Sequence, residues 1–122
     1  MKKFFILMLA MITVSVNAYA DGGYSSCKVS GGNGATVSAS IMDWDQDGYV
    51  TVQFSSDCDD YVAISFTLTL EFDITSNRSR NYVYTVKPNC NDQQTFFVYK
   101  LNNENATIVN ATVEVGGARC EQ

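Results

Sequence analysis

The chain has 122 residues, and its 13 acidic residues outnumber its 8 basic ones, for a formal net charge of −5. Nucleic acids and anionic lipids attract clustered lysine and arginine, so this acidic composition predicts that neither is a partner.

Residues 1–20 have the features of a signal peptide. Two lysines at positions 2 and 3 precede an apolar stretch, and the small-residue sequence AYA at 18–20 ends just before Asp21. The apolar stretch is shorter than the roughly 20 residues with which a helix crosses a bilayer, and no second one follows. We therefore expect no membrane insertion and a secreted or periplasmic protein. The remaining residues, 21–122, have the length of one domain.

Apolar and polar residues alternate repeatedly within residues 21–122. The clearest run spans 61–74, where apolar side chains from Val62 to Ile74 alternate with serine, threonine and acidic side chains. A period of two predicts a strand with one buried face. Because strands usually have about 5 or 6 residues, a bend or bulge is expected within this one. Further strands are predicted near Cys27 and at 36–44, 49–55, 82–87, 95–101 and 106–115.

Turn-forming residues separate these runs, at GGNG, DQDG, SSDCDD, TSNRSR, PNCND and NNEN. About seven short strands at this spacing predict an all-β fold, an antiparallel β-sandwich in a single domain. The strand count resembles that of immunoglobulin-like sandwiches, although the cysteine-tryptophan-cysteine spacing of true immunoglobulin domains is absent. One run, FFVY at 96–99, is apolar on both faces, which favours a central position in a sheet.

Four cysteines follow the signal peptide: Cys27, Cys58, Cys90 and Cys120. An even number in an exported chain predicts two disulfides, and the spacings contain no CxxC pair typical of a zinc site. If successive strands alternate in direction, all four cysteines lie at one pole of the sandwich. Three pairings are open. We prefer Cys27 with Cys120, which joins the chain ends, and Cys58 with Cys90, which joins two loops.

The segment DWDQDG at 43–48 has two interpretations, and the first is a calcium loop. Such loops take ligands from alternate acidic positions, use a glycine for the sharp turn, and add a backbone carbonyl after it. Asp43, Asp45 and Asp47 match the acidic positions, and Tyr49 would supply the carbonyl.

The second interpretation is a plain hairpin turn, for which Asp47-Gly48 is a common dipeptide. The glutamate that closes an EF-hand loop is missing, because Phe54 occupies its position. A calcium ion would therefore need Asp73 or Glu104, which belong to the same predicted pole. Calcium is accordingly the only cofactor that the sequence suggests.

The predicted pole that carries DWDQDG also carries Trp44, Tyr49, Arg78 and Arg80. Tryptophan, tyrosine and arginine are the residues that most often dominate interfaces. The chain has no histidine and therefore no Ser-His or Cys-His pair, so we expect no enzymatic activity. The sequence thus predicts a non-catalytic module that binds a protein or a glycan. The alternatives are a structural subunit of a surface fibre, a calcium-dependent adhesion module and a secreted inhibitor.

Overall fold

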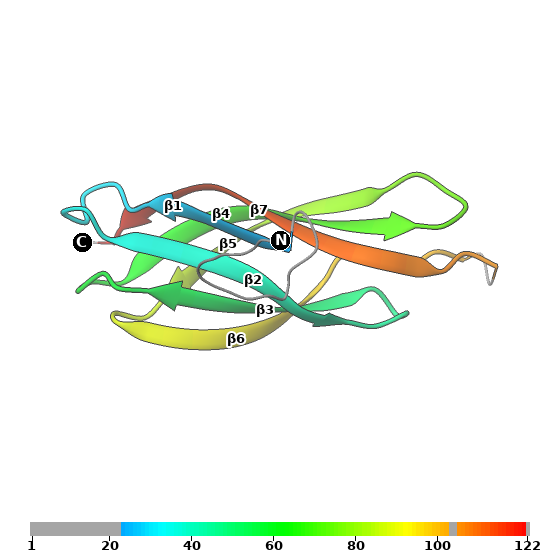
Figure 1. The fold of residues 1–122 in the computed structure, drawn as a ribbon, viewed down its shortest axis with the longest axis horizontal. Coiled ribbons are helices and arrows are strands. Elements are labelled where there is room, and N and C mark those ends of the chain that lie inside the picture. The colour runs from blue at the N-terminus through cyan, green and yellow to red at the C-terminus, as the bar shows by residue number, and fades with distance from the viewer. Residues whose placement is uncertain (1–22, 103–104, 122) are drawn as a thin grey trace, which may run out of the picture.

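A computed structural model describes residues 23–102 and 105–121. The predicted signal peptide and Glu104 lie outside these residues. Within them the chain forms seven β-strands in two antiparallel sheets (Figure 1). The described part has no helix that is long and apolar enough to cross a membrane.

The first sheet has the order β1-β2-β3-β6 and the second the order β5-β4-β7. In chain order the strands are β1 (Tyr24–Lys28), β2 (Thr36–Trp44), β3 (Tyr49–Ser56), β4 (Val62–Phe72), β5 (Arg78–Val86), β6 (Cys90–Phe97) and β7 (Ile108–Cys120).

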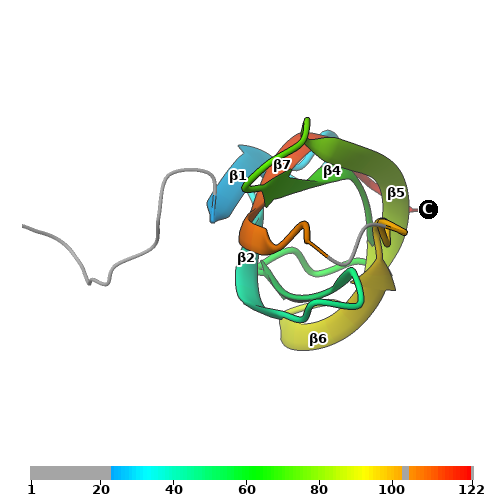
Figure 2. The same cartoon turned by 90° about the vertical axis from the view of Figure 1, so that its right-hand side faces the viewer.

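The two sheets enclose one apolar core. Figure 2 shows the strands of both sheets arranged around a common interior. Alternation decides which side chains enter it: Val50, Val52 and Phe54 of β3 face Ile64 and Leu68 of β4, and all five are fully buried. Burial of each such side chain contributes roughly 1.5–3 kcal/mol. The all-β, two-layer antiparallel prediction is therefore confirmed.

The immunoglobulin-like part of the prediction is not confirmed. In immunoglobulin constant domains the first, second, fifth and fourth strands share one sheet. Here the first sheet instead contains the first, second, third and sixth strands, because β3 pairs with β6 along its whole length, from Tyr49–Phe97 to Ser56–Cys90.

The irregularity predicted for the longest apolar run is present, but it lies in the neighbouring strand. The pairing of β4 with β5 is unbroken, whereas the pairing of β4 with β7 shifts between Ser65 and Phe66 and again near Phe72. The extra residues are Gly116 and Val109, both in β7. β7 therefore bends around a regular β4, and a glycine without a side chain occupies one of the two bulges.

Several predicted strand limits are wrong at their polar ends. β5 begins at Arg78 and β6 at Cys90, earlier than apolar alternation indicated, because RSRN and NDQQ contain only polar side chains. β6 is also an edge strand of its sheet rather than a central one. Side chains of β5 contact β6: the hydroxyl of Tyr82 donates to the carbonyl of Phe97, and that of Tyr84 donates to Asp92.

The connections alternate between two ends of the sandwich, as expected for antiparallel strands. We call the end with connections 29–35, 57–61 and 87–89 the cysteine pole, and the end with 45–48, 73–77, 98–102 and 105–107 the loop pole. All four cysteines lie at the cysteine pole, where Cys27 and Cys90 end one row of paired residues across the first sheet and Cys120 pairs with Val62. No two of them are at disulfide bonding distance in the described structure, so the predicted disulfides are not shown.

Candidate functional site

The DWDQDG segment forms a tight hairpin turn between β2 and β3. The amide of Asp45 donates to the Tyr49 carbonyl at 3.0 Å, and the amide of Gly48 donates to the Asp45 carbonyl at 3.2 Å. The Asp45 side chain caps the same turn, because its Oδ1 accepts from the amides of Asp47 at 2.9 Å and Tyr49 at 3.1 Å. The Asp45 side chain thus stabilises the turn by accepting from backbone amides that follow it, as aspartate side chains commonly do in turns.

Gly48 is required by the geometry of this turn. Its φ is +91°, a left-handed conformation that side chains with a Cβ rarely adopt. The carbonyl of Gly48 also accepts from the amide of Val98 at 2.8 Å, which brings the chain after β6 against the turn. A Cβ on Gly48 would collide with the carbonyl group of Tyr99. The turn and the segment after β6 are therefore packed together as one unit.

Each of the candidate calcium ligands Asp43, Asp47 and Asp73 bonds to a different protein group. Asp43 accepts from the Trp44 amide at 2.8 Å, Asp47 pairs with Lys100 at 2.6 Å, and Asp73 accepts from the Thr107 amide at 2.9 Å. Among the described residues, no three acidic, cysteine or histidine side chains are grouped to hold a metal ion. Calcium binding stays a prediction from the sequence, to be tested by adding the ion.

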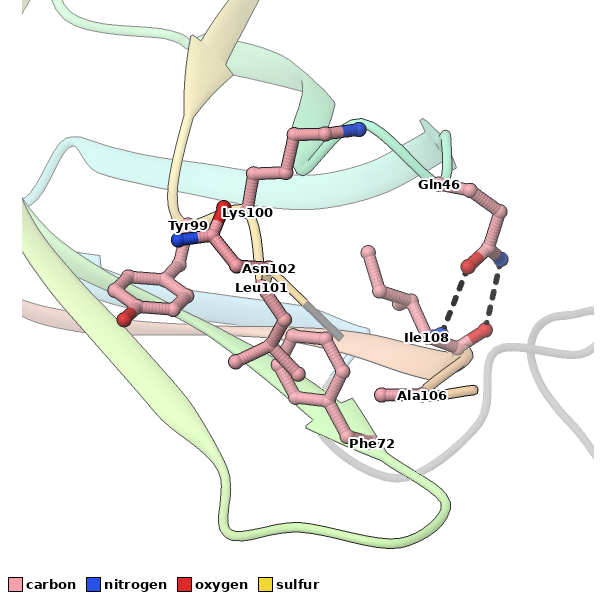
Figure 3. A pocket seen from close by; sticks show the side chains of 8 residues that line it. All are labelled: Gln46, Phe72, Tyr99, Lys100, Leu101, Asn102, Ala106 and Ile108. Carbon is pink, nitrogen blue, oxygen red and sulfur yellow. Dashed lines mark hydrogen bonds between the residues drawn. The ribbon is translucent and has the colours of Figure 1, made fainter. Parts of the chain in front are cut away.

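Gln46, at the tip of the turn, bridges the two sheets. Its Nε2 donates to the Ile108 carbonyl at 3.0 Å, and its Oε1 accepts from the Ile108 amide at 2.9 Å (Figure 3). Ile108 is the first residue of β7, so one amide side chain satisfies both backbone groups at this strand end. The sequence pattern did not single out Gln46, since a glutamine in a turn carries no periodic signal.

A pocket of about 410 Å³ opens beside this bridge at the loop pole. Phe72, Leu101 and Ile108 supply its apolar surface, while Gln46 and Lys100 lie on the side of the turn (Figure 3). Its volume falls in the range of about 300–1,000 Å³ found for small-ligand sites. The remaining lining residues are Tyr99, Asn102 and Ala106.

Two arginines of β5 stack on aromatic rings next to the pocket. The Cζ atom of Arg78 lies 5.1 Å from the centre of the Tyr99 ring, and that of Arg80 lies 5.7 Å from the centre of the Phe97 ring. The Phe97 ring in turn lies 5.3 Å from that of Tyr49. We call these five side chains the arginine-aromatic row. The contacts are within cation–π range, which holds each guanidinium in place without neutralising it.

The predicted binding residues are thus brought together only in part. Tyr49, Arg78 and Arg80 belong to the arginine-aromatic row, whereas Trp44 is partly buried and packs against the core. Phe97 and Tyr99 were missed as site residues, because the FFVY run was interpreted as the two faces of a central strand. The signal that could have identified them is position: they alternate with the buried Val98 and so face away from the core.

Lys100 adds a third cation to this surface. Its ammonium donates to Asp47, and this hydrogen bond and charge raise the pKa of Lys100 above its usual value. Arg78, Arg80 and Lys100 are three of the six basic residues that follow residue 20. Half of the basic residues that follow residue 20 therefore lie around one aromatic surface.

Comparison with known proteins identifies no relative: no protein-family model, curated protein or solved structure matches this chain. The geometry of the loop pole is therefore the basis for proposing a function.

Proposed function

We propose that this protein is a small, non-catalytic binding module, secreted or periplasmic, that recognises an acidic glycan at the loop pole. The observation that carries the proposal is the arginine-aromatic row: two guanidinium groups stacked on rings beside a pocket. The absence of histidine from the sequence supports the non-catalytic assignment. The signal-peptide features of residues 1–20 support export.

The chemistry of the row suits a sugar that carries carboxylate or sulfate groups. Arginine presents planar, bidentate donors to such anions, and stacking on a ring orders the side chain before the ligand arrives. The rings of Tyr49 and Tyr99 are 45% and 40% exposed, which offers flat apolar faces for a sugar. The adjacent pocket would then hold one sugar unit of a longer chain.

The test is a binding titration with heparin and oligogalacturonate fragments, which present sulfate and carboxylate groups respectively. The double variant Arg78→Gln, Arg80→Gln should weaken binding at least tenfold. The matched control is Lys87→Gln, Arg119→Gln, which makes the same charge change at the cysteine pole. It should leave affinity within about twofold, because salt screens the interaction between charges that lie more than about 10 Å apart. Equal weakening by both variants, or no binding by the unaltered protein, would contradict the proposal.

A second candidate function is that of a structural subunit of a surface fibre. It is favoured by the edge strand β5, where Val83 is 70% exposed and where β4 is the only strand partner in the described structure. Such edges can pair with a second chain. Sedimentation velocity over a hundredfold range of concentration separates the two: assembly that Val83→Lys abolishes supports the fibre subunit, and a constant monomer supports the binding module. A calcium-dependent adhesion module and a secreted inhibitor stay alternatives without a structural observation in their favour.

A further inference from the structure

We infer that the protein forms a single intramolecular disulfide, between Cys58 and Cys120, and keeps Cys27 and Cys90 as thiols. This inference assigns a modification to the cysteine pole and is independent of the function proposed for the loop pole. It also differs from the two disulfides that the even number of cysteines predicts.

The positions of Cys58 and Cys120 carry the inference. Their Sγ atoms lie 3.6 Å apart, and both side chains contact the core. A disulfide has a sulfur–sulfur distance of about 2.05 Å, so closure needs an approach of about 1.5 Å, which small side-chain rotations supply. The backbone holds both residues: the Cys58 amide donates to Ser56 Oγ at 3.2 Å, and the Cys120 amide donates to the Ser30 carbonyl at 3.0 Å.

Strand register separates Cys27 from Cys90. Cys27 pairs with Val37, Val37 with Ser56, and Ser56 with Cys90, so the two cysteines end one row across all four strands of the first sheet. Three strand spacings amount to about 14 Å. Disulfides require Cα atoms within about 7 Å of each other, so these two cysteines cannot pair within one molecule.

Register also disfavours the pairing of Cys27 with Cys120. Ser25 Oγ accepts from the Val115 amide at 2.9 Å, and Ser30 forms a parallel bridge with Arg119. Cys27 therefore lies beside residues 116–117, three or four positions before Cys120. That offset is about 10 Å along a strand, which is too far for a disulfide without moving the chain.

Another competitor is the pairing of Cys58 with Cys90. The backbones are close, because the Asn89 amide donates to the Cys58 carbonyl at 3.0 Å. The sulfurs point to different partners, however: Cys90 Sγ lies 3.3 Å from the Asn91 carbonyl, whereas Cys58 Sγ lies against Cys120 Sγ. Side-chain direction therefore favours Cys58–Cys120.

The chemistry is thiol–disulfide exchange with an oxidant of the thiol–disulfide oxidoreductase class, which oxidising compartments such as the bacterial periplasm contain. One thiolate of the pair attacks the disulfide of the oxidant and forms a mixed disulfide with it. The second thiolate then attacks this mixed disulfide and displaces the oxidant's thiolate. The Cys58–Cys120 bond forms, the oxidant's sulfur–sulfur bond breaks, and the oxidant leaves as a dithiol with the two protons. Cys27 is slow to compete, since burial raises the pKa of its thiol and lowers the thiolate fraction.

The bond would join two segments on which the sandwich depends. Cys58 lies in the connection that crosses from β3 to β4, and Cys120 ends β7, which flanks β4. The two cysteines are 62 positions apart in sequence, so the bond closes a long loop of the unfolded chain. Reduction should therefore lower Tm by more than about 10 °C.

Peptide mapping tests the connectivity directly. Cleavage after lysine and arginine puts each cysteine on a different peptide, because Lys28, Arg78, Arg80, Lys100 and Arg119 separate them. The exported, full-length protein is purified without reductant, alkylated, digested and analysed by mass spectrometry. We expect a cross-link between peptides 29–78 and 120–122, with Cys27 and Cys90 alkylated. A cross-link from Cys27 to Cys120 or from Cys58 to Cys90, or four alkylated cysteines, would overturn the inference.

A variant pair checks the same point by stability. Cys27→Ser should keep the full shift of Tm on reduction, whereas Cys58→Ser should melt lower and show no shift. The comparison depends on the change caused by reductant rather than on absolute stability, so it remains informative even when Cys58→Ser folds poorly at higher temperature. A reductant shift that persists in Cys58→Ser, or disappears in Cys27→Ser, would contradict the assigned bond.

Discussion

The two poles of the sandwich are built from the same kind of connection but are closed in different ways. At the cysteine pole backbone groups bond to each other, as Asn89 does to Cys58 and Ser30 to Cys120, and thiols lie between them. At the loop pole backbone bonds also hold the turn, as Val98 does to Gly48, but the Gln46 side chain makes the contact between the sheets, to the backbone of Ile108. The pocket of the loop pole lies beside this side-chain contact, and Gln46 is one of its lining residues.

The hollows at the two poles also have different linings. The cysteine pole has a hollow of about 330 Å³ whose lining includes Asp57, Asp59 and Asp60 together with several glycines. The pocket of the loop pole is lined by aromatic and aliphatic side chains and by Lys100, with the stacked arginines beside it. The two hollows therefore offer different chemistry to a ligand: carboxylates at the cysteine pole, and apolar side chains with one ammonium group at the loop pole.

The largest effect is expected from Gly48→Ala, compared with Gly34→Ala at the cysteine pole. Both glycines have φ near +90°, but an added Cβ meets nothing within 4 Å at Gly34 and collides with Tyr99 at Gly48. We expect Gly34→Ala to cost about 1 kcal/mol, from φ strain alone, and Gly48→Ala to cost about 3 kcal/mol or more in the free energy of unfolding. Urea denaturation measures both. Equal losses would show that the turn is not packed against the segment after β6.

A smaller loss is expected from Gln46→Ala. This change leaves the amide and carbonyl of Ile108 without their partner, so the free energy of unfolding should fall by about 2 kcal/mol. Gln93→Ala is the matched control, because Gln93 makes an exposed side-chain bond to Gln53 at 3.2 Å. Its loss should stay below about 0.5 kcal/mol. If the two variants lose the same stability, Gln46 is not the bridge between the sheets.

Asp45→Ala distinguishes the hairpin-turn interpretation of DWDQDG from the calcium-loop interpretation. The hairpin interpretation predicts a loss of about 1 kcal/mol from the two missing turn bonds, with the same value in millimolar calcium and in chelator. Thermal melts of the unaltered protein and of the variant under both conditions measure this. A rise of several degrees with calcium that disappears in Asp45→Ala would instead establish the metal site.

The smallest effect is expected where β5 meets β6, between the two poles. Burial, and then the hydrogen bond and charge of Asp92, raise the pKa of the Tyr84 phenol above its usual value of 10.0. The stability linked to this group is therefore complete below pH 10 and is lost as the pH rises through the higher folded-state pKa. Tyr84→Phe should show a shallower fall of stability above pH 10, measured by urea denaturation at several alkaline pH values. Parallel curves would contradict this account of Tyr84.

The sequence was informative where the buried face was regular. Alternation in the run at 61–74 identified the central strand β4, although β4 ends at Phe72 and Ile74, predicted on the buried face, is 58% exposed. Alternating strand directions placed the four cysteines at one pole, as the structure has them. The polar ends of β5 and β6 could not be found in this way, since their side chains have no apolar period. Sheet partners determine those residues: Arg78 and Arg80 are in β5 because they pair with Leu70 and Leu68 of β4.

Individual residues of the candidate site could be predicted from the sequence, but their arrangement could not. Tyr49, Arg78 and Arg80 were identified by residue type, but their neighbours were not, because the row depends on how β5 and β6 from different sheets come together. The opposite holds for DWDQDG. Its aspartates are spaced as in a calcium loop, yet Asp47 contacts Lys100, which is distant in sequence. Asp73, the further ligand that was expected, contacts Thr107 instead. Local spacing does not specify contacts of this range.

The central claim, recognition of an acidic glycan at the loop pole, is tested most directly by following backbone amide NMR shifts while a heparin or oligogalacturonate fragment is added. The account predicts saturable shifts at Tyr49, at Arg78 and Arg80, and at residues 97–100, with residues 57–60 of the cysteine pole unchanged. Shifts confined to the cysteine pole, or spread evenly over both poles, would contradict it.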